Sequence, residues 1–245
     1  MSTSSQARGQ LVRKLQSIYT LQADDIAALA DLPLRFKDIE ENADLVQEGD
    51  QPSECCLLVD GFVCRYKILG EGQRQIFSFH IPGDIPDLQS LHIGTMDHSL
   101  GALTPCRVAY IPHSAMDRLL RSQPNLAAAF WRDTLIDAAV FREWLAGVGR
   151  RSAYQRIAHL ICEVFTRLRS VGLAEGWEFA LPITQGEIAD ALGLTPVHVN
   201  RVLQQLRAEG LIATRGARWS VRDWDLLQEA GDFDAAYLHL RPLAA

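Results

Sequence analysis

The fold of the C-terminal part is decided by residues 183–222, which read ITQGEIADALGLTPVHVNRVLQQLRAEGLIATRGARWSVR. Thr184 begins a T-x-x-E capping box, in which two side chains satisfy free backbone N–H groups of a first helical turn. Gly193 suits the left-handed conformation that ends a helix. Thr195 is a second N-cap, and Pro196 follows at the first helical position, where no backbone N–H is needed. The stretch therefore predicts two short helices joined by a tight turn.

Apolar residues recur at helical spacing in both predicted helices and give each of them one buried face. They are Ile188, Ala189 and Leu192 in the first helix and Val199, Val202, Leu203 and Leu206 in the second. After Gly210, two short β-like runs, LIATR and RWSVR, flank Gly216 and Ala217. Two helices followed by a β-hairpin form a winged helix-turn-helix, which predicts binding to duplex DNA. The alternative is an ordinary helical hairpin in a protein core, which the agreement of caps, turn and hairpin disfavours.

The chain has 245 residues, enough for two domains with separate cores. No apolar run approaches the roughly 20 residues that span a bilayer, and the N-terminus lacks the apolar segment of a secretory signal. The five cysteines are odd in number and show no C-x-x-C spacing; they are Cys55, Cys56, Cys64, Cys106 and Cys162. A reduced, cytoplasmic chain without a membrane partner is therefore expected.

The net charge of −6 is unevenly distributed along the chain. Residues 151–222 carry nine arginines and six acidic residues, whereas the segments on either side of them are acidic. A basic module within an acidic protein is consistent with phosphate contact at one place and repulsion elsewhere. The charge pattern therefore supports DNA binding without deciding it.

The N-terminal half carries a different pattern. Residues 8–32 read as helical, and residues 45–112 form short β-like runs. The runs are separated by turns that contain glycine, such as Asp60-Gly61 and Pro82-Gly83. Strands of this length, punctuated in this way, predict an antiparallel sandwich or jelly roll.

A helical pattern returns at Ser114 and, after a second start signal at 122–124, continues to about Val148. Its apolar residues form more than one stripe. The stripe predicted for a dimer contact contains Phe130, Thr134, Phe141, Trp144 and Val148, and a second stripe contains Trp131, Leu135, Ala138 and Leu145. A long helix with two apolar faces usually packs against two partners, which here would be its own β-roll and a second copy of the chain. The alternative is a helix buried within a monomer.

We therefore predict an α+β chain with three parts. Residues 1–121 form an effector-type antiparallel β-roll, or jelly roll, with N-terminal helices. Residues 122–149 form a long dimerisation helix and hinge, and residues 150–245 form the winged helix-turn-helix domain with an acidic tail. The tail is expected to pack on the DNA-binding domain, and a contact with RNA polymerase is the alternative.

This order of elements resembles that of the Crp/Fnr family of bacterial transcription regulators, over about residues 45–222. The resemblance rests on the glycines in VQEGD (Gly49), VDGFV (Gly61) and PGD (Gly83). It rests above all on YQRIAHLICEVFTRL followed by LPITQGEIADALGLTPVHVNRVLQQLRAEGLI. The resemblance implies a cyclic-nucleotide-binding-like sensor domain and a C-terminal domain that binds a palindromic promoter site as a homodimer.

The segment that would hold a cyclic nucleotide departs from the family's pattern. Family members that bind one carry a Gly-Glu pair for the ribose and an Arg-Ser or Arg-Thr pair for the phosphate. Here the segment reads PGDIPDLQSLHIGTMDHSLGAL, and the candidate effector-pocket residues are Asp84, Asp87, His98 and Ser99. Asp97 and His98 stand where the arginine would meet the phosphate, which is electrostatically poor. We therefore do not expect the chain to bind cyclic AMP in the usual way.

Other cofactors are not expected either. The oxygen-sensing branch of the family carries an N-terminal cysteine cluster for an iron–sulfur centre, whereas no cysteine precedes Cys55 here. His80, His92 and His98 lie near one candidate pocket, but they lack the fixed spacing of a haem or metal site. The identity and existence of an effector stay open.

The recognition helix departs from the family as well. Many members carry Arg and Glu near its start and a further Arg one turn later. Arg201 matches the later Arg and can bind guanine O6 and N7, whereas Val197 can only touch a thymine methyl. The predicted base-reading residues are Val197, His198, Asn200 and Arg201. Phosphate contacts are predicted at the helix starts, Thr184, Gln185 and Thr195, and on the wing, Arg215 and Arg218.

The leading prediction is a homodimeric, effector-responsive transcription regulator that binds double-stranded promoter DNA. One alternative is an effector-independent DNA binder with a purely structural β-roll, and another is a cyclic-nucleotide-binding regulatory module. An enzyme is not expected, because no nucleophile–base constellation is visible and Asp84 and Asp87 lack a catalytic partner.

Overall fold

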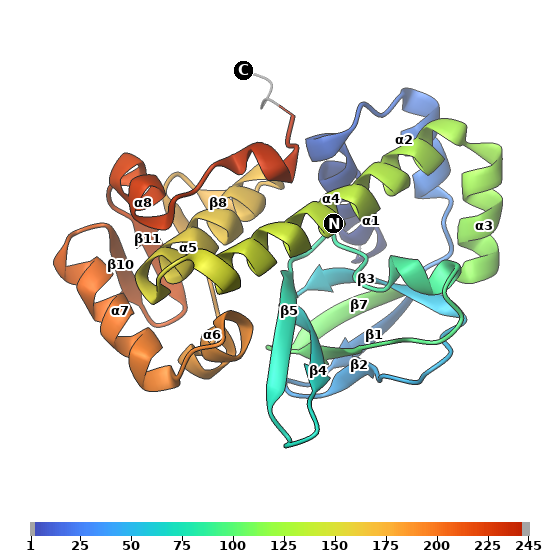
Figure 1. The fold of residues 1–245 in the computed structure, drawn as a ribbon. Coiled ribbons are helices and arrows are strands. Elements are labelled where there is room, and N and C mark those ends of the chain that lie inside the picture. Colours follow the sequence, from blue (N-terminus) through green and yellow to red (C-terminus); the bar gives the residue numbers. More distant parts are fainter. Residues whose placement is uncertain (1–2, 242–245) are drawn as a thin grey trace. The chain divides into compact units, whose positions relative to one another are not determined.

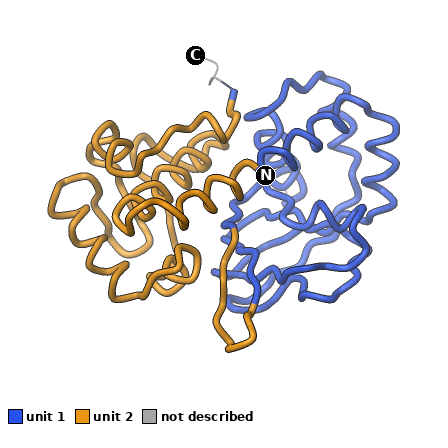
Figure 2. The backbone as a smooth tube through the Cα atoms, viewed as in Figure 1, with its two compact units in different colours: residues 1–67, 78–138, 241–245 blue, residues 68–77, 139–240 orange. Residues whose placement is uncertain are grey.

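The computed structural model describes residues 3–241, and Figure 1 shows the order of its elements. By backbone contacts the chain divides into two compact units, drawn in different colours in Figure 2. Among the described residues, the first unit contains 3–67, 78–138 and 241, and the second contains 68–77 and 139–240.

The first unit is built from short antiparallel strands and helices. Its helices before the strands are α1 (Thr3–Ile18) and α2 (Ala23–Ala30). The strands are β1 (Arg35–Ile39), β2 (Asp44–Val46), β3 (Glu54–Asp60), β4 (Val63–Ile68), β5 (Arg74–His80), β6 (Ser99–Ala102) and β7 (Cys106–Pro112), with the 3-10 helix η1 (Leu88–Leu91) before β6 and α3 (His113–Ser122) after β7. Residues 68–77, at the end of β4 and the start of β5, are grouped with the second unit. One sheet has the order β1-β7-β3 and the other β2-β6-β4-β5. The predicted antiparallel β-roll is confirmed.

Strand β3 contributes to two cores. Cys55, Leu57 and Val59 lie in a core with apolar residues of α1, α2, α3 and β7. Cys56 and Leu58 lie in a second core, with residues from both sheets. Because successive side chains of a strand point to opposite faces, a strand buried on both faces reads as the continuous apolar run CCLLV. The two adjacent cysteines therefore point to opposite faces of the strand.

Two glycines of this unit are required by close approaches. Gly61 has a φ of 90° in the turn between β3 and β4, and a Cβ there would lie 2.6 Å from the Pro105 carbonyl oxygen. Gly83 has a φ of 103°, and its Cβ would lie 3.0 Å from the Gln10 carbonyl oxygen of α1. Only glycine takes such a φ without strain. The backbone of α1 therefore lies directly against the turn that was predicted to bind an effector.

Helix α4 (Pro124–Arg150) is 27 residues long and begins at the predicted start signal. The division between the two units falls within this helix, between residues 138 and 139. Leu126, Ala129 and Phe130 of its first half are buried in the core of the first unit. The helix thus contributes residues to both units.

The second unit contains the predicted winged helix-turn-helix. It consists of α5 (Ala153–Ser170), β8 (Ala174–Glu175), β9 (Glu178–Ala180), α6 (Gln185–Leu192), α7 (Pro196–Ala208), β10 (Ile212–Arg215), β11 (Arg218–Val221), α8 (Trp224–Gly231) and the 3-10 helix η2 (Ala235–Leu238). The sheet order is β10-β11-β9-β8, so the predicted hairpin is extended by two further strands. These strands were not predicted, because runs of two and three residues give no periodic signal.

The segment after the wing packs against α5, as expected. The ring of Trp224 lies 5.4 Å from that of Phe165, and Tyr237 stacks on His159 with ring centres 5.7 Å apart. A Cβ on Gly231 would lie 2.7 Å from the His159 backbone nitrogen, so the tail touches the helix backbone itself. Among residues 3–241, no helix has both the length and the apolar sequence that a membrane span would need.

Candidate functional site

The first helix of the helix-turn-helix, α6, is fixed at both ends by its own sequence. The Thr184 hydroxyl accepts from the Glu187 backbone N–H at 3.2 Å, and the Glu187 carboxylate accepts from the Thr184 N–H at 2.6 Å. Gly193 ends the helix in the left-handed conformation, with φ 64° and ψ 44°. The predicted capping box and turn glycine are thus confirmed. They leave Thr184 exposed and Gln185 half-buried at the start of the helix.

The second helix, α7, buries the predicted face and exposes the other. Thr195 caps it by accepting from the His198 backbone N–H at 3.2 Å, and Pro196 occupies the first helical position. The buried residues are Val199, Val202, Leu203 and Leu206, as the spacing predicted. Their packing fixes which side chains of α7 face outward.

The outward face of α7 contains the four residues predicted to read bases. Val197 is 80% exposed, Arg201 is exposed, and His198 and Asn200 are half-buried. Arg201 Nη2 lies 3.0 Å from His198 Nε2, and Asn200 Nδ2 donates to Gln185 Oε1 at 3.0 Å. The predicted residues are therefore together on one surface, and three of them take part in side-chain hydrogen bonds.

The wing carries at its tip the two arginines predicted to bind DNA phosphates. Arg215 and Arg218 face each other in the β10–β11 register, on either side of a turn in which Gly216 has a φ of 60°. Both arginines are exposed, and Arg218 Nε lies 3.6 Å from Glu178 Oε2. An exposed ion pair of this kind is weak, so it leaves Arg218 able to bind a phosphate.

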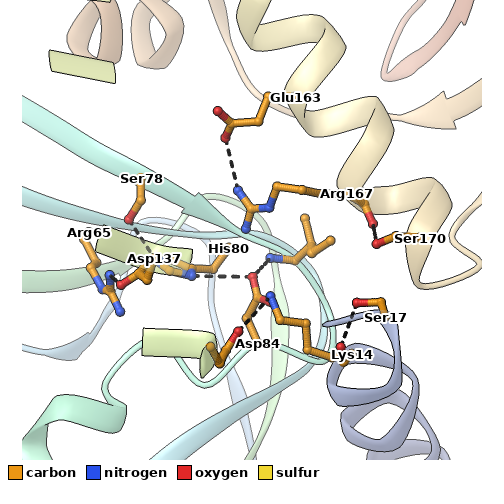
Figure 3. A network of polar contacts seen from close by, with 12 residues as sticks. Lys14, Ser17, Arg65, Ser78, His80, Asp84, Asp137, Glu163, Arg167 and Ser170 are labelled. Atoms are coloured by element: carbon orange, nitrogen blue, oxygen red, sulfur yellow. Dashed lines mark hydrogen bonds and ion pairs between the residues drawn. The ribbon is translucent and has the colours of Figure 1, made fainter. Parts of the chain in front are cut away.

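The predicted effector residue Asp84 lies inside the first unit, just after β5. One carboxylate oxygen lies 2.8 Å from Lys14 Nζ of α1. The other accepts from the Ile81 backbone N–H at 3.1 Å and lies 3.5 Å from His80 Nδ1. Figure 3 shows Lys14 and His80 turned toward Asp84. Burial lowers the pKa of His80 to about 4, so this imidazole is neutral and Lys14 supplies the positive charge.

Asp87, the second predicted carboxylate, is also inside the protein. Its Oδ1 accepts from the Cys56 backbone N–H at 2.7 Å, and burial raises its pKa to about 6. The neighbouring Pro86 carbonyl accepts from Arg65 Nε at 2.8 Å, and the same guanidinium pairs with Asp137 of α4. The segment 81–87 is therefore held to α1, β3 and β4 by polar contacts, and Arg65 connects it to α4.

The other two predicted effector residues also have partners within the first unit. His98 Nδ1 lies 2.6 Å from Asp97 Oδ1, and its Nε2 lies 3.3 Å from the Gln89 amide nitrogen. Burial lowers the pKa of His98. The Ser99 hydroxyl accepts from the Glu48 backbone N–H at 3.0 Å. In the part of the chain that the structure describes, no group of three or more His, Cys, Asp or Glu side chains could hold a metal ion.

Comparison with known protein families agrees with the fold of both the β-roll and the helix-turn-helix part. Residues 155–230 match the Crp-like helix-turn-helix domain, and residues 36–123 match the cyclic nucleotide-binding domain. The chain belongs to the Crp/Fnr family. It is a DNA-binding transcription regulator of this type with an N-terminal sensor domain, and it is not an enzyme.

Individual Crp/Fnr proteins align with most of this chain. Electron transport regulator A of Shewanella oneidensis is 27% identical over 198 residues, which cover 81% of this chain and 79% of the relative. The fumarate nitrate reduction regulatory protein of Klebsiella oxytoca is 26% identical over 211 residues, which cover 86% and 84%. The solved structure of FixK2 from Bradyrhizobium japonicum aligns with a TM-score of 0.74 and 26% identity, over 81% of this chain and 98% of FixK2. Each similarity therefore spans much more than the DNA-binding module.

Helix α4 of this Crp/Fnr regulator carries the residues predicted for a dimer contact. Phe130 is buried in the first unit's own core, so it is not part of an exposed stripe, which corrects that part of the prediction. Thr134 donates to the Phe130 carbonyl oxygen at 3.1 Å, and Trp144 Nε1 donates to Glu163 at 2.9 Å. The large exposed apolar residues of α4 are Trp131, Leu135, Phe141, Leu145 and Val148. Phe141 and Val148 belong to the predicted dimer stripe, and Trp131, Leu135 and Leu145 belong to the second predicted stripe.

A buried carboxylate of α5, Glu163, was not predicted. It is fully buried and accepts from Trp144 Nε1 of α4 and from the Tyr237 hydroxyl, at 2.9 and 2.8 Å. The Tyr237 hydroxyl also lies 3.0 Å from His159 Nε2. A glutamate within the apolar run HLICEVF was the available signal, because an unpaired carboxylate in such a place would be unfavourable. Glu163 joins the end of α4 to α5 and to the C-terminal segment.

Proposed function

We propose that this regulator acts as a homodimer that binds a palindromic promoter site. The observation that carries the proposal is the apolar stripe of α4, where Trp131, Leu135 and Leu145 are 71%, 55% and 75% exposed. Large apolar side chains gathered along one helix mark a surface that another protein covers. A second copy of the same helix, related by a two-fold axis, is the simplest cover, because each stripe then faces its own equivalent.

In a two-fold dimer, the two copies of α7 would enter successive major grooves on the same face of the DNA. In helix-turn-helix dimers the half-sites lie about 34 Å apart, which matches one turn of the duplex. Val197, Asn200 and Arg201 would then meet base edges in the major groove, and Thr184, Thr195, Arg215 and Arg218 would meet phosphates. Double-stranded promoter DNA in the cytoplasm is thus the proposed partner, and RNA polymerase is a candidate second partner through the acidic tail.

The proposal includes control of DNA binding by the sensor domain. An effector that binds one of two arrangements of α4 more tightly would shift the population toward it. Asp84, Asp87, His98 and Ser99 stay the candidate effector residues. Cyclic AMP is not the proposed effector, because Asp97 and His98 replace the arginine that a cyclic phosphate would need. Calorimetry that shows micromolar binding of cyclic AMP would contradict this part of the proposal.

A second candidate function is an effector-independent DNA reader whose β-roll is purely structural. The observation that favours it is the internal bonding of Asp84 to Lys14 and of Asp87 to the Cys56 backbone. Selection of bound DNA from a random pool, with candidate effectors added or withheld, separates the two functions. An effector-responsive regulator would enrich its site differently in the two arms, whereas an effector-independent reader would enrich it equally.

Substitution of Leu145 tests the dimer. Leu145→Glu would place a charge in the proposed contact, and we expect sedimentation to show a shift from dimer to monomer. Leu226→Glu is the matched control, because Leu226 is 50% exposed but lies on α8 and not on α4. A wild-type chain that sediments as a monomer at concentrations where it binds its selected site, or a Leu145→Glu variant that stays dimeric, would refute the proposed arrangement.

A further inference from the structure

Two residues of the reading face of α7, His198 and Arg201, are bonded to each other. Arg201 Nη2 lies 3.0 Å from His198 Nε2. A guanidinium has donors and no acceptor, so His198 Nε2 is the acceptor and the ring proton is on Nδ1. Residues three apart are neighbours on a helix surface, so the pair forms without any change in the backbone. His198 therefore uses its acceptor nitrogen on Arg201.

The backbone of His198 is fixed by the cap of the helix. Its N–H donates to the Thr195 hydroxyl at 3.2 Å, and Pro196 precedes it in the first turn. His198 is half-buried, whereas Arg201 is exposed. The imidazole is thus a short, anchored group beside a long side chain that would otherwise sample many rotamers in water.

A second pair on the same surface joins the two helices of the motif. Asn200 Nδ2 of α7 donates to Gln185 Oε1 of α6 at 3.0 Å. Gln185 is the first residue of α6, directly after the Thr184 cap, so its backbone is also fixed. The contact uses one of the two N–H donors of the Asn200 amide and leaves its carbonyl oxygen available.

We propose that His198 and Gln185 are positioning residues, which hold Arg201 and Asn200 in the orientation that reads bases. The proposal rests on the proposed DNA-reading function and revises the roles predicted for these two residues, a base contact and a phosphate contact. Arg201 keeps four N–H donors, which suit guanine O6 and N7. Asn200 keeps one donor and one acceptor, which suit adenine N7 and N6. The half-site read by α7 therefore contains a guanine and an adenine, with a thymine methyl against Val197.

A double-mutant cycle, measured with the selected DNA site, tests whether His198 positions Arg201. Arg201→Ala should weaken specific binding by about 5- to 150-fold, the range for a lost bidentate base contact. His198→Ala should weaken it by about 2- to 10-fold and relax the preference for guanine at the same base pair. In the Arg201→Ala background, His198→Ala should add less than about twofold, because its target is already gone. His198→Gln, which restores a side-chain acceptor, should recover part of the guanine preference.

The outcomes separate this inference from the function on which it rests. If the wild-type chain selects no sequence from the pool, DNA reading itself is refuted. If it selects a site but His198→Ala and Arg201→Ala act additively, His198 contacts the DNA directly and its positioning role is refuted. The positioning role also fails if His198→Ala leaves the guanine preference unchanged. Gln205→Ala is the control, since Gln205 lies on α7 and its amide bonds to Glu209.

The proposal that Gln185 positions Asn200 is tested in the same way, at the adenine instead of the guanine. Gln185→Ala should relax the preference at the adenine position and leave the guanine position unchanged, and the reverse should hold for His198→Ala. A Gln185→Ala variant that loses affinity equally for every sequence would identify Gln185 as a phosphate contact and overturn this part of the proposal. Thermal melting of each variant should match the wild type, because both pairs lie at the surface of the motif.

Discussion

The outward face of α7 and the segment 81–87 were both identified from sequence as candidate sites, but the structure uses their polar side chains in opposite ways. On α7, Arg201 and Val197 are exposed, and the apolar residues lie behind them. In the segment 81–87, Asp84 and Asp87 are buried and bonded to the protein itself. The side chains of α7 can therefore contact another molecule directly. Asp84 and Asp87 would first have to break their bonds within the protein.

The difference shows what a family motif fixes and what it leaves free. The turn at Gly83 is present in both its conformation and its place, so the β-roll is built in the way the resemblance implies. The function of the carboxylates next to it depends on what packs there, and here α1 brings Lys14 to Asp84. A turn that matches the family's pattern can therefore keep its geometry while the side chains next to it stabilise the fold.

The largest effect is expected from breaking the buried pair of Lys14 and Asp84. Asp84→Ala should lower the free energy of unfolding by about 3 kcal/mol, because the half-buried Lys14 ammonium loses its nearest partner. The loss should lie at the low end of the usual range, since Lys14 keeps Asp133 at 3.4 Å. Urea denaturation monitored by circular dichroism measures it.

The exposed pair of Lys67 and Glu48 is the matched control in the same unit, with 2.8 Å between its charged atoms. Glu48→Ala should change the stability little, because water screens exposed charges. Equal effects of Asp84→Ala and Glu48→Ala would mean that Asp84 is not the buried structural group described above, and would favour its role as an effector contact.

The next effect is the pH dependence due to Asp87. Burial raises the pKa of this carboxyl from 3.8 to about 6, so the folded state binds its proton more tightly than the unfolded state does. Its contribution to stability is present below about pH 4 and is lost as the pH rises to about 6, and it amounts to about 3 kcal/mol. Asp87→Asn cannot ionise and should not show this loss.

The measurement is the stability of the wild type minus that of Asp87→Asn between pH 4 and pH 7. The difference should fall across the interval. His80 titrates in the opposite sense, because burial lowers its pKa to about 4, but it is present in both proteins and cancels. A flat difference would indicate that Asp87 is ionised throughout, as a carboxylate facing a solvated effector pocket would be.

The accuracy of the sequence-based predictions follows the range of the interactions involved. The capping box at Thr184, the turn at Gly193 and the buried face of α7 depend on residues a few positions apart, and all were predicted. The antiparallel β-roll was also predicted, since its strands are separated by turn glycines. These features need only local propensity and a repeating apolar pattern.

The features that were missed depend on contacts between distant segments. Nothing near Asp84 indicates that Lys14 reaches it, and nothing near Phe130 indicates which side of α4 meets the core. Glu163 was missed because its partners, Trp144 and Tyr237, come from different elements. A buried charge or the phase of a long helix is set by tertiary packing, which a single sequence does not display.

The third prediction concerns Arg201, on the exposed face of α7. Arg201→Ala should weaken binding to the selected site by about 1–3 kcal/mol and leave binding to random duplex DNA nearly unchanged. The reason is that a bidentate contact to guanine exists only at the correct base pair. Fluorescence anisotropy with both duplexes at one salt concentration measures the ratio. Equal losses on the two duplexes would assign Arg201 to the phosphate backbone.

The smallest effect, and the one that tests whether the exposed surface is divided between base and phosphate contacts, is expected for Arg218 on the wing. Arg218→Ala should weaken binding to specific and random DNA alike and reduce the slope of log affinity against log salt concentration by about 1, because one phosphate contact releases about one counterion. Arg118→Ala is the control, since Arg118 is an exposed arginine of α3 in the first unit, and it should leave the slope unchanged. If Arg218→Ala leaves the slope intact, the wing does not touch the backbone, and the basic contribution to DNA binding must come from the helix starts instead. If it changes the sequence preference, the wing reads bases, and the reading surface extends beyond α7.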